Sequence, residues 1–240
     1  MKTIGLIGGM SPESTMIYYR ALNHGVRMRL GGYASAQILM KSLNFAEIRH
    51  LQTTGEWDLA GFKLAESAAQ LEHAGADLIL LATNTMHKCA SAIEAALKTP
   101  FLHIADTTAN RLLEDGRQRP GLMGTAFTME EDFYIGRLQS RGGLDVVVPN
   151  AADRAVINAV IFNELVHGVR EPGSVQAFLE IAGRLKDAGA DSLILGCTEV
   201  GMLVTEANSP LPVFDTALIH VEAATNAALS ETDATNSADT

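Results

Sequence analysis

The chain has 240 residues, of which 47% are hydrophobic, so it can bury one large or two small cores, and global disorder is excluded. Its formal net charge is −10 and no cluster of Lys or Arg stands out, which argues against nucleic acid and anionic membrane surfaces as partners. No apolar run approaches the roughly 20 residues of a membrane span. The two cysteines provide no disulfide framework and the N-terminus does not resemble a signal peptide, so we expect a cytoplasmic protein.

Short apolar strands alternate with helical patterns along the first half of the chain. Ser11 is a suitable N-cap for the first helix, and Pro12 suits its first position. Continuously apolar strands separated by helices indicate a parallel sheet that helices cover on both faces. In chain order we expect a strand Thr3–Ile7, a helix Ser11–Leu30, a strand Ala36–Met40, a helix Trp57–His73, a strand Leu78–Ala82, a helix His87–Leu97 and a strand Phe101–Ile104.

The second half of the chain repeats the first. "GLMGT" at Gly121 matches "GLIGG" at Gly5, and "GADSLILGCTE" at Gly189 matches "GADLILLATNT" at Gly75. This duplication predicts an α/β fold of two pseudo-symmetric lobes, each with a central four-stranded parallel sheet flanked by helices. The repeated strands are Val146–Val148, Leu193–Leu195 and Val213–Phe214. We expect residues 1–105 and about 210–229 in the first lobe, 106–209 in the second, and a disordered tail at 230–240.

Thr83 and Cys197 occupy equivalent positions, each at the end of a third strand. Ligands of parallel sheets bind beyond the carboxyl ends of the strands, so the pair is expected on opposite walls of a cleft between the lobes. A thiol that enters a helix N-terminus lies in a field that favours the thiolate. The alternative for Cys197 is a small buried filler, which its polar neighbours Thr198 and Glu199 disfavour.

Two proton-transfer groups that face each other suit racemisation or epimerisation, because one removes a proton from carbon and the other returns it from the opposite face. The backbone N–H groups of "TNT" and "CTE" could stabilise the carboxylate next to the carbanion. Glu199 could hold a substrate ammonium, or it could be a solvated acid of a first helical turn. Cys89 is interpreted as packing.

Five motifs, "GLIGGMSPEST", "NTMH", "HIADTT", "GT" with a following Thr, and "GCTE", together resemble the aspartate/glutamate racemase family, over residues 2 to about 229. The resemblance is greatest to its enterobacterial branch of broad-specificity and L-aspartate/glutamate-specific racemases. It implies a two-lobed α/β homodimer that acts on an amino acid without pyridoxal phosphate. It also implies Thr83 and Cys197 as the catalytic pair, and contacts to the substrate from Met10, Ser11, Gln52, Asn84, Thr85, Thr125, Thr128, Thr198 and Glu199.

The first member of the family's usual cysteine pair is here Thr83. A hydroxyl is a far poorer base than a thiol, and His87 could relay its proton or could simply pack. Basic side chains that would hold a second substrate carboxylate are absent from Ile157–Val169, which leaves Arg49 or Gln52 and predicts a loose side-chain selectivity.

Other functions remain open at this point. A dicarboxylate decarboxylase or cis–trans isomerase could use one cysteine, and an amino-acid sensor would need none. The first loop lacks a nucleotide motif. Two Glu-x-x-His pairs, Glu47–His50 and Glu164–His167, are better explained by the duplication than by a metal site, and we expect neither a metal nor another cofactor.

Overall fold

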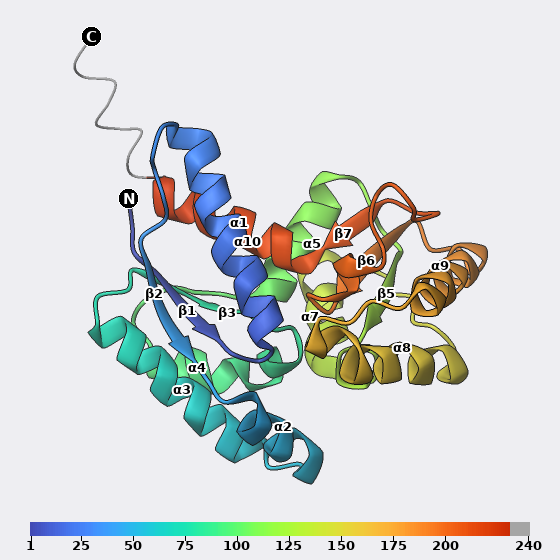
Figure 1. Ribbon diagram of the computed structural model, residues 1–240, viewed down its shortest axis with the longest axis horizontal. Helices are drawn as coiled ribbons and strands as arrows, with labels where there is room; N and C mark the ends of the chain where they lie inside the picture. Colours follow the sequence, from blue (N-terminus) through green and yellow to red (C-terminus); the bar gives the residue numbers. More distant parts are fainter. Residues whose placement is uncertain (231–240) are drawn as a thin grey trace. The chain divides into compact units, whose positions relative to one another are not determined.

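The computed structural model describes residues 1–230, so the expected tail lies, except for Ser230, outside the described residues. The chain forms two compact units (Figure 1). The first consists of Met1–Ala82, Cys89–His103 and residues 220–230, and the second of Thr83–Lys88 and Ile104–Ile219. No helix within residues 1–230 combines the length and hydropathy that a membrane crossing requires.

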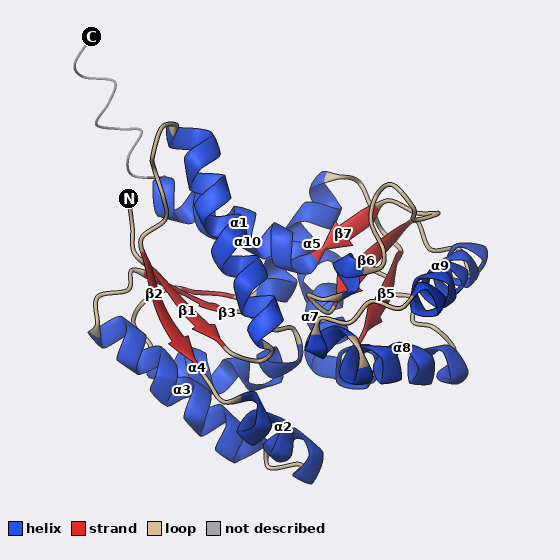
Figure 2. Ribbon diagram, in the orientation of Figure 1, coloured by secondary structure: helices blue, strands red, loops and turns tan. Residues whose placement is uncertain are grey.

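The first unit contains a four-stranded parallel sheet in the order β2-β1-β3-β4 (Figure 2). Helices α1 and α10 cover one face, and α3 and α4 the other. Its strands are β1 (Ile4–Gly8), β2 (Ile38–Ser42), β3 (Leu78–Leu81) and β4 (Phe101–Leu102), and its helices α1 (Pro12–Leu30), α2 (Phe45–Thr54), α3 (Trp57–His73), α4 (Ala90–Ala96) and most of α10 (Thr216–Leu229). Every residue of β1 and β3 is buried, as continuous apolar strands in a covered parallel sheet should be.

The second unit contains a three-stranded parallel sheet in the order β5-β6-β7. Its strands are β5 (Pro120–Gly124), β6 (Ser192–Gly196) and β7 (Val213–Asp215), and its helices α5 (Ile104–Glu114), α6 (Ala126–Glu130), α7 (Asp132–Gly142), α8 (Ala151–Asn163) and α9 (Pro172–Asp187). The expected strand at Val146–Val148 is reduced to one bridge, between Gly121 and Val147. The order of the two sheets is therefore the same, which agrees with the duplication.

The units differ from the expected lobes at three places, one of which is residues 104 and 105, which belong to the second unit. Strand β7 pairs with β6, so residues 210–219 belong to the second unit, while residues 220–230 belong to the first. Residues 83–88 also belong to the second unit, although β3 before them and α4 after them lie in the first. The expected helix His87–Leu97 is divided into a 3-10 helix, Thr85–Cys89, and α4. Helix α2 was not expected.

The duplication extends to the helix caps. Ser11 caps α1 by accepting a hydrogen bond from the amide of Ser14 at 3.2 Å. Thr125 caps α6 by accepting one from the amide of Thr128 at 3.3 Å. The two pairs are related by the same 114-residue shift as Thr83 and Cys197, so one local solution for a strand-to-helix turn occurs in both units.

Candidate functional site

Cys197 follows β6 directly and is 8% exposed. Its Sγ atom donates a hydrogen bond to Oε2 of Glu199 at 3.1 Å, and Oγ1 of Thr198 donates to the same oxygen. All three side chains are buried. The "CTE" motif therefore forms one hydrogen-bonded group in which the carboxylate accepts from the thiol.

The thiol of Cys197 is held in its protonated form. Burial raises its pKa well above the usual value, and the charge and hydrogen bond of Glu199 raise it further, with a smaller contribution from Asp215. The expectation of a field that favours the thiolate is wrong here. Only a short 3-10 helix, Val200–Met202, follows Cys197, so no long helix dipole offsets burial and the nearby carboxylates.

The segment Thr83–Thr85 is attached to the same sheet as Cys197. Nδ2 of Asn84 donates to Oγ1 of Thr216 at 3.0 Å, and Thr216 in turn donates to the carbonyl of Leu195 at 2.7 Å. Leu195 lies two residues before Cys197 on β6. This chain of contacts ties the segment that carries Thr83, itself 8% exposed, to the carboxyl ends of β6 and β7.

Buried hydroxyls form a second group around this segment. Oγ1 of Thr85 lies 2.9 Å from Oγ1 of Thr125, which lies 3.1 Å from Oγ1 of Thr128. Asn84 is 3% exposed, and its Oδ1 atom has no hydrogen-bond partner among the described residues. A buried acceptor without a donor is costly, so Oδ1 is suited to accept an N–H from a ligand.

His87 does not act on the Thr83 hydroxyl in this structure. Its Nε2 atom accepts a hydrogen bond from the amide of Ile104 at 3.2 Å, and its Nδ1 atom lies 2.7 Å from the carbonyl oxygen of Thr83. Both ring nitrogens are therefore occupied by backbone groups. Of the two interpretations that the sequence left open, the structure favours packing over a proton relay.

Three of the expected contact residues lie in the first unit. Met10 and Ser11 follow β1 and Gly9, whose φ of +89° is a backbone conformation that favours glycine. Gln52 lies on α2, where its Oε1 accepts a hydrogen bond from Nη1 of Arg49 at 3.4 Å. All three are buried, and burial lowers the pKa of the Arg49 guanidinium. That these residues reach the substrate of Cys197 stays a prediction.

Two residues that belong to this group were missed from the sequence. Thr216 joins Asn84 to β6, and Asp215 accepts hydrogen bonds from the amides of Ala217 and Leu218 at 2.9 and 3.1 Å. Burial raises the pKa of the Asp215 carboxyl. The signal was available, because "FDT" ends a strand that the duplication had already identified, and polar residues at such ends face ligand sites.

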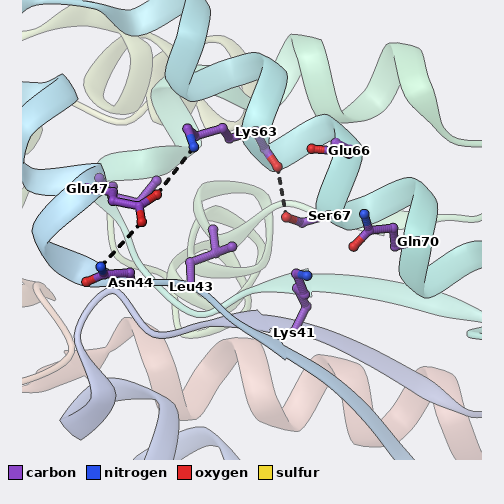
Figure 3. A pocket seen from close by; sticks show the side chains of 9 residues that line it. Lys41, Leu43, Asn44, Glu47, Lys63, Glu66, Ser67 and Gln70 are labelled. Atoms are coloured by element: carbon purple, nitrogen blue, oxygen red, sulfur yellow. Dashed lines mark hydrogen bonds and ion pairs between the residues drawn. The ribbon is translucent and has the colours of Figure 1, made fainter.

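A separate pocket of about 140 Å³ lies in the first unit, between β2, α2 and α3 (Figure 3). Its Lys63 pairs with Glu47 at 3.3 Å, and Asn44 also donates to Glu47 (Figure 3). Its wall contains two lysines and two glutamates, whose formal charges cancel, so the pocket does not favour an ion of either sign. The lining residues are Lys41, Leu43, Asn44, Glu47, Ile48, Lys63, Glu66, Ser67 and Gln70, none of which was an expected contact.

The Glu-x-x-His carboxylates are engaged in ordinary contacts. Glu47 binds Lys63, and Glu164 accepts a hydrogen bond from Ser174 at 2.7 Å. Within residues 1–230, no three His, Cys, Asp or Glu side chains form a group that could hold a metal ion.

Comparison with known proteins places this geometry in a family. The family model described as Asp/Glu/hydantoin racemase matches residues 7–224. The broad specificity amino-acid racemase RacX of Bacillus subtilis is 25% identical over 221 residues, which are 88% of this chain and 92% of RacX.

Two solved structures are similar over nearly the whole chain. A Yersinia pestis protein provisionally assigned as an Asp/Glu racemase is 45% identical, with a TM-score of 0.89, over 95% of this chain and 100% of its own. An aspartate racemase homologue from Pyrococcus horikoshii is 34% identical, with a TM-score of 0.83, over 95% and 99%. The protein therefore belongs to the Asp/Glu/hydantoin racemase family, and its enzyme class is that of the isomerases, as an amino-acid racemase.

Proposed function

We propose that this protein racemises a free amino acid by moving its α-proton between Cys197 and Thr83, without pyridoxal phosphate. The observation that carries the proposal is the bond from Sγ of Cys197 to Oε2 of Glu199. It pairs a buried thiol with a carboxylate that can take its proton. Family membership supports the reaction type, because racemases invert a carbon centre.

Proton removal begins at Cys197. The thiol passes its proton to Glu199 across 3.1 Å, and the thiolate then removes the α-proton from one face of the substrate. The Cα–H bond breaks, an S–H bond forms, and the electron pair moves into the substrate carboxylate. The raised pKa of the thiol makes the thiolate a strong base in this buried site.

Proton return uses Thr83 on the opposite face. Its hydroxyl donates a proton to Cα, and the alkoxide recovers a proton from solvent, to which Glu199 releases the one it had accepted. A hydroxyl is a weaker acid than a thiol, so this half of the reaction is expected to be slower. In the reverse direction the two groups exchange roles, and no net proton is gained or lost.

Substrate binding is assigned to the remaining expected residues. The hydroxyls of Thr85, Thr125 and Thr128 and the backbone N–H of Thr198 are suited to hold the α-carboxylate, and the unpartnered Oδ1 of Asn84 to accept from the α-ammonium. Before it accepts the thiol proton, the Glu199 carboxylate balances the ammonium charge, and Met10, Ser11 and Gln52 are the further contacts that the family resemblance implies.

The substrate is aspartate, glutamate or a wider set of amino acids. Arg49 is the cationic candidate for a side-chain carboxylate and lies against Gln52, which can bind a neutral side chain equally well. The relatives are named for aspartate and for broad specificity, which fits a site that can bind both a charged and a neutral substrate side chain. We further propose a homodimer, as the family resemblance implies, and a cytoplasmic location, as the cysteine content suggests.

The test is deuterium exchange at Cα in heavy water, starting from each enantiomer of aspartate, glutamate and homoserine. The wild type should exchange and invert at least one of them. Cys197→Ala should abolish inversion, and it should abolish exchange from the enantiomer that Cys197 deprotonates, whereas Cys89→Ala should change neither. Unchanged exchange from both enantiomers in Cys197→Ala would sink the assignment. Turnover of a dicarboxylate without an α-amino group would indicate a decarboxylase or cis–trans isomerase, and binding without exchange would indicate a sensor.

A further inference from the structure

His87 is a buried imidazole in the segment that carries Thr83, and it is only 2% exposed. Its Nε2 accepts from the amide of Ile104 at 3.2 Å, and its Nδ1 meets the carbonyl of Thr83 at 2.7 Å. A backbone amide can only donate and a carbonyl can only accept. The ring is therefore neutral, with its proton on Nδ1 and its lone pair on Nε2.

This tautomer makes His87 a brace inside the second unit. One nitrogen closes the turn from Thr83 to His87 on the carbonyl of Thr83 itself. The other nitrogen fixes that turn to the first amide of α5, which belongs to the same unit. The Thr83 carbonyl is thus linked by hydrogen bonds through His87 to helix α5, in addition to its connection along the chain to strand β3.

Three further contacts attach the same segment to the second unit. They are the bond from Asn84 to Thr216, the bond between Thr85 and Thr125, and the ion pair of Lys88 with Glu131 at 2.5 Å. None of them touches Thr83. His87, by contrast, contacts the backbone of Thr83 directly.

We infer that His87 is a positioning residue that compensates for the weak acidity of Thr83 by fixing its place relative to the reacting carbon. This inference rests on the proposed function, in which Thr83 returns the proton. A misplacement of about 1 Å can cost about 100-fold in rate. A hydroxyl is a weaker acid than a thiol, so a loss of rate from misplacement is harder to tolerate and its position must be fixed more closely.

The two nitrogens can be tested separately by amide variants. His87→Asn places an N–H near Nδ1 and keeps the donor to Thr83, whereas His87→Gln places an oxygen near Nε2 and keeps only the acceptor for Ile104. His87→Ala removes both, and His73→Ala, at an exposed position in the last turn of α3, is the control. Thermal melting of each variant checks that it is folded.

The first measurement does not need activity. Amide hydrogen exchange of peptides that cover residues 83–88 should accelerate in His87→Ala and His87→Gln, and stay near the wild-type rate in His87→Asn and His73→Ala. If His87→Ala leaves this exchange unchanged, the brace does not exist and the inference is overturned. This result is independent of whether the protein racemises anything.

The second measurement is the ratio of deuterium exchange in recovered substrate to inversion. With Thr83 displaced, carbanions made by Cys197 return to the starting enantiomer, so His87→Ala and His87→Gln should raise this ratio about tenfold or more. His87→Asn should restore it. If His87→Asn is as impaired as His87→Ala while amide exchange is normal, His87 transfers protons and the inference fails.

If the wild type shows no α-proton exchange, the proposed function fails, and amide exchange alone decides the brace. If His87→Ala does not fold, the comparison of the Asn and Gln variants decides it.

Discussion

The Sγ atom of Cys197 lies 3.1 Å from Oε2 of Glu199, and both side chains are buried at the carboxyl end of β6. Burial and the carboxylate together raise the pKa of the thiol, so in the resting site the proton stays on Sγ and is hydrogen-bonded to Glu199. A thiol in this state can give a proton at once, and it can take one only after Glu199 has accepted its own. This relationship determines how the site should respond to pH and to substitution.

Replacing Glu199 by Gln should lower the pKa of Cys197, because it removes the charge that raises it after burial. Alkylation of the thiol by iodoacetamide should then begin at a lower pH than in the wild type. Racemisation should nevertheless fall by about 10²–10⁴, because the proton acceptor is gone. Glu114→Gln, at an exposed ion pair of the same unit, is the control. An unchanged alkylation profile would contradict the proposed pairing.

Replacing Thr83 by Cys should speed the slower half of the reaction, because a thiol is a far better acid and base than a hydroxyl. Deuterium exchange from the enantiomer that Thr83 deprotonates should rise by about tenfold or more. Exchange from the other enantiomer should change much less. Equal gains or equal losses for both enantiomers would argue against separate roles for Thr83 and Cys197.

Replacing Asp215 by Asn should be neutral or stabilising at pH 7. Burial raises the pKa of this carboxyl, so the folded state holds its proton to a higher pH than the unfolded chain, and stability falls as pH rises through that folded value. Asn keeps the Oδ1 acceptor for the amides of Ala217 and Leu218. Urea unfolding should show a benefit at pH 7 that disappears at pH 4, whereas a loss at pH 7 alone would refute this assignment.

His220 should make the first unit sensitive to acid. Burial lowers its pKa from 6.5 to about 4, and the ring accepts from the Tyr18 hydroxyl at 2.8 Å and donates to the carbonyl of Leu102 at 2.9 Å. Between those two pKa values the unfolded chain binds more protons, so the free energy of unfolding falls as pH falls, by about 3 kcal/mol in all.

The variant His220→Gln tests this pH dependence. Gln retains a donor for Leu102 but cannot titrate, so its free energy of unfolding should change less between pH 6.5 and pH 4 than that of the wild type. His73→Gln, at an exposed position, should follow the wild type. Parallel curves for His220→Gln and the wild type would show that another group causes the acid sensitivity.

The sequence by itself determined the class of fold and the residues worth testing. Short apolar runs such as β1 and β3 favour strands of a covered sheet, and a duplication keeps equivalent positions equivalent. That is why Thr83 and Cys197 could be paired, and why Ser11 and Thr125 both cap helices. Local chemistry and periodicity are sufficient for such inferences, because they depend on neighbours along the chain.

Tertiary structure decided the electrostatics and the attachments. The pKa of Cys197 depends on its burial and on the orientation of Glu199, neither of which can be read directly from the order of residues. The expected thiolate was therefore wrong. His87 could have faced a hydroxyl or a backbone, and the amide of Ile104, 17 residues away, shows that its Nε2 faces the backbone. Residues 83–88 belong to the unit of Cys197 and not to that of β3, because their buried hydrogen bonds to distant residues outweigh chain continuity.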